Sequence, residues 1–117
     1  MSRWVDVGAT DDLAEGSMKL VTVEGVDLLV ARAADGFYAA DERCPHMGGR
    51  LAMGTLEGRV VKCPRHGSKF DLSDGHVIQW TDWTGLTLRA AKLLKAPRSL
   101  RTHRTQVRDG RVLVELE

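Results

Sequence analysis

A chain of 117 residues has room for one domain, since soluble domains usually contain about 100 to 150 residues. Its 17 Lys and Arg residues against 16 Asp and Glu give a net charge of +1, which argues against a dedicated nucleic-acid binder. No apolar run approaches the roughly 18 residues of a membrane span, and residues 1–10 lack the apolar core of a signal peptide. We therefore expect a single cytoplasmic domain over 1–117, whose two cysteines bind a metal or act in catalysis rather than form a disulfide.

The predicted elements are short strands separated by turn signals in which Glu or Asp precedes Gly. This spacing is typical of a small all-β domain, and the Asp109-Gly110 turn indicates a hairpin at the end of the chain. The expected strands, in chain order, are Trp4–Val7, Lys19–Val23, Asp27–Ala33, Phe37–Asp41, Arg59–Lys62, Ser68–Asp71, His76–Gln79, Thr102–Val107 and Arg111–Leu116.

The segment Thr84–Ala96 departs from this pattern, because its apolar residues recur at helical spacing. We expect a short amphipathic helix, ended by Pro97, within an insertion over about 80–98. Its other side carries Arg89, Lys92 and Lys95. Such a basic side is usually just solvated, but docking of a partner is the alternative interpretation.

The charges are unevenly distributed along the chain. Residues 1–46 have a net charge of −5, and residues 47–117 have a net charge of +6. We therefore expect the folded molecule to be an electric dipole.

The residues most suited to bind a metal gather in two short segments, Cys44-Pro45-His46 and Cys63-Pro64-Arg65-His66-Gly67. Both cysteines of the chain and two of its four histidines lie there, with sixteen residues between the segments. A close Cys and His pair converges with a distant pair only when the backbone loops around a common centre. Two facing loops around a metal centre are therefore expected.

Two thiolates and two imidazoles can hold either one tetrahedral zinc ion or the two irons of a [2Fe–2S] cluster. Structural zinc sites usually draw each close pair from one residue type, Cys with Cys or His with His. Here each segment supplies one Cys and one His, which lets each loop bridge both irons. The mixed pairing favours the cluster, and zinc remains the alternative.

The two segments resemble the cluster-binding loops of Rieske proteins, on the matching residues Cys44-Pro-His46-Met-Gly-Gly and Cys63-Pro-Arg-His66-Gly-Ser-Lys-Phe-Asp. The resemblance extends to the opening Arg-Trp-Val, to Phe-Tyr-Ala-Ala-Asp before the first loop, and to the closing Asp-Gly-Arg-Val-Leu-Val-Glu-Leu. Only about residues 80–98 lack a clear counterpart in the shortest members of that family.

The resemblance implies an antiparallel β-sandwich with a small cluster-binding subdomain over about 43–70. It implies a [2Fe–2S] cluster with Cys44 and Cys63 on the inner iron and His46 and His66 on the outer iron. Gly67, like Gly49, is expected to let the backbone approach the cluster sulfurs closely.

The resemblance also implies a one-electron carrier that is not itself an enzyme. Its expected partners are other redox proteins, a flavin reductase upstream and a ring-hydroxylating or related oxygenase downstream. No nucleic-acid partner is expected.

Four positions bear on the reduction potential. Rieske proteins of cytochrome bc complexes carry a disulfide over the cluster, but the matching positions here are Gly49 and Arg65. Ser68 matches a Ser that donates to sulfur, whereas Phe70 stands where a donating Tyr would be. Because such donors stabilise the reduced state, we expect a potential in the lower part of the family range of about −150 to +300 mV.

Two alternative functions remain at this point. One is an accessory subunit similar to the small subunit of nitrite reductase, whose close relatives often lack ligands. The other is a zinc-stabilised binding module, which would be colourless where a cluster protein is red-brown.

Overall fold

The computed structural model of the chain describes residues 3–45, 49–65, 67–80 and 98–116. The helix expected over 84–96 and the two candidate ligands His46 and His66 lie outside these residues. The elements in chain order are β1 (Arg3–Ala9), η1 (Thr10–Asp12), β2 (Met18–Val23), β3 (Val26–Ala33), β4 (Gly36–Asp41), η2 (Leu51–Met53), β5 (Thr55–Glu57), β6 (Val60–Lys62), β7 (Lys69–Asp71), β8 (Val77–Gln79), β9 (Thr102–His103), β10 (Thr105–Arg108) and β11 (Arg111–Leu116), where η marks a 3-10 turn.

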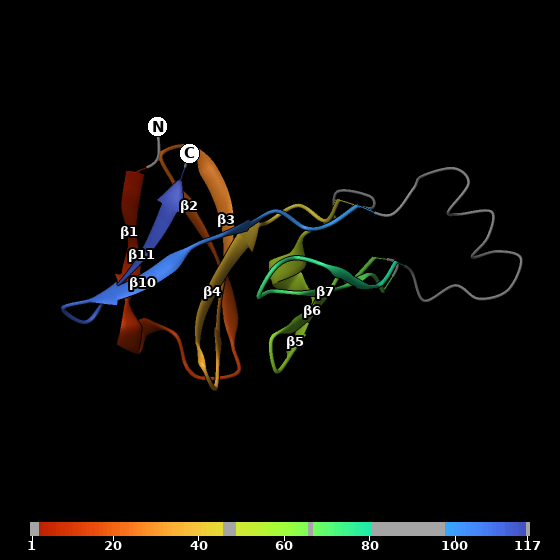
Figure 1. Ribbon diagram of the computed structural model, residues 1–117, viewed down its shortest axis with the longest axis horizontal. Helices are drawn as coiled ribbons and strands as arrows, with labels where there is room; N and C mark the ends of the chain where they lie inside the picture. The colour runs from red at the N-terminus through yellow and green to blue at the C-terminus, as the bar shows by residue number, and fades with distance from the viewer. Residues whose placement is uncertain (1–2, 46–48, 66, 81–97, 117) are drawn as a thin grey trace, which may run out of the picture.

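The described strands form three antiparallel sheets, which confirms the all-β prediction. One sheet has the order β1-β11-β10 and a second has the order β2-β3-β4-β9. These two sheets make the sandwich, and the third sheet, β5-β6-β7-β8, lies beside β4 (Figure 1). No helix among the described residues is long and apolar enough to cross a membrane.

Two features of this topology differ from the strands expected from the sequence. The strand β5 was not expected, because its three residues, with Leu56 half-buried between two exposed side chains, are too few to establish an alternating pattern. The strand expected over Thr102–Val107 is divided at Arg104: β9 pairs with β4, whereas β10 pairs with β11. Alternation of apolar and polar residues cannot reveal this change of sheet, because Val107 is the only apolar residue in this part of the sequence.

The strand β3 is buried on both of its faces. Leu28 and Val30 point into the sandwich core, which also contains Val5, Val112 and Val114. The neighbours of these two residues along β3, Leu29 and Ala31, belong to a second core. This second core contains, from the loops and the third sheet, Cys44, Leu51, Val61, Cys63, Phe70, Leu72, Trp80 and Leu100. The central sheet therefore separates two cores, and the two expected loops rest on its second face.

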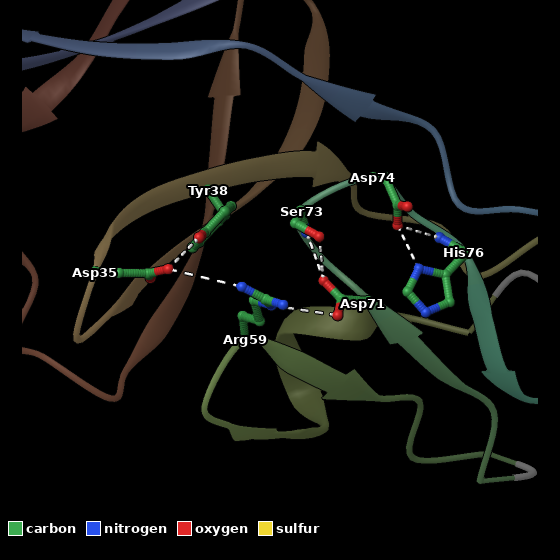
Figure 2. Close-up of polar contacts among 7 residues, drawn as sticks. All are labelled: Asp35, Tyr38, Arg59, Asp71, Ser73, Asp74 and His76. Carbon is green, nitrogen blue, oxygen red and sulfur yellow. Dashed lines mark hydrogen bonds and ion pairs between the residues drawn. The ribbon is translucent and has the colours of Figure 1, made fainter.

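Polar contacts also join the third sheet to the sandwich (Figure 2). The Arg59 guanidinium lies 3.3 Å from Asp71 and 3.8 Å from Asp35, and Asp35 accepts a 2.8 Å hydrogen bond from Tyr38. Burial raises the pKa of Asp71, but hydrogen bonds from Ser73 and Arg59 outweigh it and leave that pKa below the ordinary 3.8. The stabilisation by Asp71 is therefore present above the unfolded-state pKa and is lost as the pH falls through the folded-state value.

The turn at Gly75 makes a close backbone contact with the returning chain at Leu100. The Leu100 amide donates to the Gly75 carbonyl at 2.8 Å. Gly75 has a φ of +81°, and a Cβ there would lie 1.9 Å from the Leu100 carbonyl oxygen. Only glycine fits at this position, both for its backbone conformation and for this contact.

Replacement of Gly75 by Ala is expected to destabilise the fold more than replacement of Gly25. Gly25 has a similar φ of +76° with nothing within 4 Å of a Cβ, so Gly25→Ala measures backbone strain alone. We expect about 1–2 kcal/mol for Gly25→Ala and roughly a further 1–3 kcal/mol for Gly75→Ala, from urea unfolding curves. An equal loss of unfolding free energy in the two variants would show that the contact with Leu100 does not contribute to stability.

Candidate metal centre

The first loop is closed at its base by a short ladder of backbone hydrogen bonds. The Leu51 amide donates to the Glu42 carbonyl at 3.0 Å, and the Cys44 amide donates to the Gly49 carbonyl at 2.8 Å. Between these two bonds, Arg43 and Arg50 form an isolated antiparallel bridge. The ladder extends from the end of β4 and fixes the Cys44 backbone relative to the central sheet.

The Glu42 carboxylate lies beneath this ladder and is 1% exposed. Its Oε1 accepts a 2.8 Å hydrogen bond from the Ala52 amide, at the start of η2. Its Oε2 lies 3.6 Å from the Arg50 guanidinium. Sequence reasoning missed this role, because an acidic residue beside Asp41 and Arg43 looks like part of an exposed turn.

The second loop is an extended hairpin between β6 and β7. The Cys63 amide donates to the Ser68 carbonyl at 2.7 Å, directly beyond the strand pairing of Lys62 with Lys69. Gly67 has a φ of +71°, and its carbonyl accepts a 2.9 Å hydrogen bond from the Gln79 side chain. Both cysteines are thus held by a backbone hydrogen bond at the edge of their loops.

The Ser68 hydroxyl donates to the Trp80 carbonyl oxygen and is fully buried. A hydroxyl carries one proton, so a sulfur acceptor has to compete with this carbonyl. Phe70 is also fully buried, in the core that contains both cysteines. Tuning of the potential at these two positions stays a prediction.

The two cysteines are not joined by a disulfide, and each is 2% exposed. The loops touch at Gly49, where a Cβ would lie only 2.6 Å from the Cys63 sulfur. Gly49 therefore brings the backbone of the first loop against a sulfur of the second, as expected. Buried thiols on two touching loops suit soft metal ions such as those of iron–sulfur clusters.

The full set of four ligands stays a prediction. His46 and His66 are outside the described residues, and within those residues no three Cys, His, Asp or Glu side chains gather in a metal-binding arrangement. The two described donors, Cys44 and Cys63, fit the cluster in chemistry and burial. Their two loops belong to one core, so the predicted facing pair of loops is present.

The positions matched to the disulfide of the cytochrome bc proteins also lie side by side. A Cβ on Gly49 would be 3.0 Å from Cγ and 3.1 Å from Cδ of Arg65. The Arg65 side chain thus packs where the two loops meet, and no covalent link closes them here.

Comparison with known proteins agrees with this geometry. The family model described as Rieske [2Fe-2S] domain matches residues 3–90. The ferredoxin component of the naphthalene 1,2-dioxygenase system of Pseudomonas putida is 31% identical over 116 residues, which cover 97% of this chain and 96% of that protein.

Solved structures give the same result. The ferredoxin of carbazole 1,9a-dioxygenase from Nocardioides aromaticivorans IC177 superposes with a TM-score of 0.75 at 26% identity, covering 95% of each chain. A chain from a complex of reduced oxygenase and oxidized ferredoxin in carbazole 1,9a-dioxygenase has a TM-score of 0.77 at 29% identity. That match covers 95% of this chain and 91% of the other.

Replacement of Gly49 by Ala is expected to lower the amount of iron and sulfide bound per chain, because its methyl group would displace the Cys63 sulfur. The control is Gly58→Ala in the β5–β6 turn, where φ is +62° and nothing lies within 4 Å of a Cβ. This control carries backbone strain but no contact with a sulfur. Equal iron and sulfide in both variants would contradict the role assigned to Gly49.

Proposed function

The chain belongs to the Rieske [2Fe–2S] domain family, and from this premise we propose that it carries single electrons from a flavin reductase to an oxygenase. The observation that carries the proposal is the mutual coverage of 97% and 96% with a ferredoxin component, with both cysteine-containing loops present. By contrast, this chain covers only 17% of the matched oxygenase component of 3-ketosteroid-9-alpha-monooxygenase. A carrier is therefore favoured over an oxygenase.

In this proposal Cys44 and Cys63 hold one iron, and His46 and His66 hold the other. The bound cluster supplies reversible uptake of one electron. The chain's part is to keep both thiolates in place and shielded from water, which the backbone bonds of Cys44 and Cys63 and their burial support. Electron transfer is fast when the protein around the cluster moves little as the charge of the cluster changes.

The proposal also includes the domain organisation and the cellular location of the protein. Residues 1–117 form one domain, in which about 43–70 contain the cluster-binding loops. The pairing of β7 with β8 supports an extension of this subdomain to Gln79. A cytoplasmic location is supported by two cysteines that are not joined by a disulfide, which suits a reducing compartment.

The composition of the purified protein tests the cofactor. Anaerobically purified protein is expected to be red-brown, to contain iron and acid-labile sulfide in equal amounts, and to give a rhombic EPR signal after reduction with dithionite. A colourless protein that contains zinc would overturn the proposal.

Replacement of His46 or His66 by Cys is expected to abolish the rhombic EPR signal, since a negative thiolate would replace a neutral imidazole on the outer iron. His76→Cys is the matched control, because His76 is an exposed residue bonded to Asp74. This control should keep the parent signal. Survival of the signal in either of the first two variants would show that the altered histidine is not a ligand.

Replacement of Phe70 by Tyr is expected to raise the reduction potential, because a hydroxyl would come near the sulfurs of its core. A hydrogen bond to a charged group contributes about 1.5–3 kcal/mol, and about 1.4 kcal/mol corresponds to about 59 mV for one electron. The shift should therefore be at most about 60–130 mV by voltammetry, and Ser68→Ala should move the potential downwards. Unchanged potentials in both variants would show that these two positions do not tune the cluster.

A further inference from the structure

An open hollow of about 400 Å³ lies beside the first loop, between Cys44 and the returning segment after residue 97. Cys44 and Pro45 form one part of its wall, and three exposed arginines, Arg43, Arg98 and Arg101, form much of the rest. Asp41 is the one acidic residue among the described residues of the lining, so this part of the hollow carries an excess of positive charge. We name it the arginine hollow.

We propose that the arginine hollow is the docking site for acidic side chains of a redox protein partner, which places the partner next to the thiolate of Cys44. Guanidinium groups suit this task, because their planar donors pair with carboxylates through two parallel hydrogen bonds. The inference rests on the proposed electron-carrier function and adds to it the surface and the charge of the partner.

The charge distribution of the whole fold supports an acidic partner. In the described part of the chain, the sandwich (residues 3–41 and 102–116) contains six basic and ten acidic residues. The described residues between them, 42–45, 49–65, 67–80 and 98–101, contain eight basic and four acidic residues. The resulting dipole points its positive end at the two loops, which steers an acidic protein towards that end at low salt.

A second hollow competes for the same role. It lies beside the second loop, where Cys63, Pro64 and Gly67 line it together with Met53, an apolar side chain that is 74% exposed. Its described lining contains one cation, Lys62, and no arginine, so it carries less positive charge than the arginine hollow. The two hollows flank different thiols, and variants on each side distinguish them.

The test uses cluster-loaded protein and two charge-matched double variants. Arg43→Gln with Arg101→Gln alters the hollow, while Arg98 is kept because its guanidinium donates to the Pro45 carbonyl at 3.2 Å. The control, Arg104→Gln with Arg108→Gln, removes the same charge from the β9–β10 segment on the sandwich. Iron content and the EPR signal are measured first, in the parent and in each variant. A parent without the rhombic signal would refute the electron-carrier function itself, whereas a parent with the signal leaves only the docking proposal to be tested.

The rate of oxidation of the reduced protein by ferricyanide, measured by stopped flow, reports the charge of the surface at which this anion approaches the cluster. Each ferricyanide takes one electron from the cluster and becomes ferrocyanide. At low ionic strength we expect the hollow variant to react about threefold to tenfold more slowly than the control variant, with a weaker dependence on salt. With the cationic acceptor hexaamminecobalt(III), the hollow variant should react faster than the control. Equal rates in the two double variants would overturn the proposal.

Competition separates an acidic protein from a small anion. Poly-glutamate should slow ferricyanide reduction by the parent more than by the hollow variant, at constant ionic strength, while inorganic phosphate should act no more strongly than chloride. If phosphate competes as well as poly-glutamate, the hollow is a small-anion site and the proposal fails. It also fails if Lys62→Gln, in the second hollow, rather than the hollow variant removes the inhibition by poly-glutamate.

Discussion

The burial of β3 on both faces is the constraint on which the other parts of the structure depend. Leu28 and Val30 are buried against the outer sheet of the sandwich, and Leu29 and Ala31 are buried against the loops and the third sheet. Because each face must be covered, neither core can be removed without exposing apolar area on the central sheet. The loops with the two cysteines are part of that cover, so the metal centre and the fold stabilise each other.

The loops use this support to fix two soft donors without a covalent link. Backbone hydrogen bonds hold Cys44 and Cys63, the buried Glu42 ties the first loop to η2, and Gly49 leaves room for a sulfur. In a carrier of single electrons, such a frame keeps the ligand positions similar in the two oxidation states. The absence of a side chain at Gly49 is therefore as much a part of the site as the thiols.

Sequence patterns predicted the strands with regular alternation and the two loops with unusual residue types. The hairpin of β10 and β11 was evident from its alternation and its Asp-Gly turn, and the two loops were evident because paired Cys and His are typical of metal sites. The change of sheet at Arg104, the short β5 and the buried carboxylate of Glu42 were missed. The change of sheet depends on the pairing of β9 with β4, which is distant in the chain, and the burial of Glu42 depends on how the first loop folds back to Ala52. The strand β5 has only three residues in which to show a pattern.

The central claim is that two thiolates and two imidazoles share one [2Fe–2S] cluster, and its most direct test is pulsed EPR of the reduced protein. The protein would be prepared with ¹⁵N-labelled histidine and compared with unlabelled protein. Couplings from two histidine nitrogens are expected, which change with the label and are absent when His46 and His66 are both replaced. A reduced cluster without any histidine coupling would contradict the account.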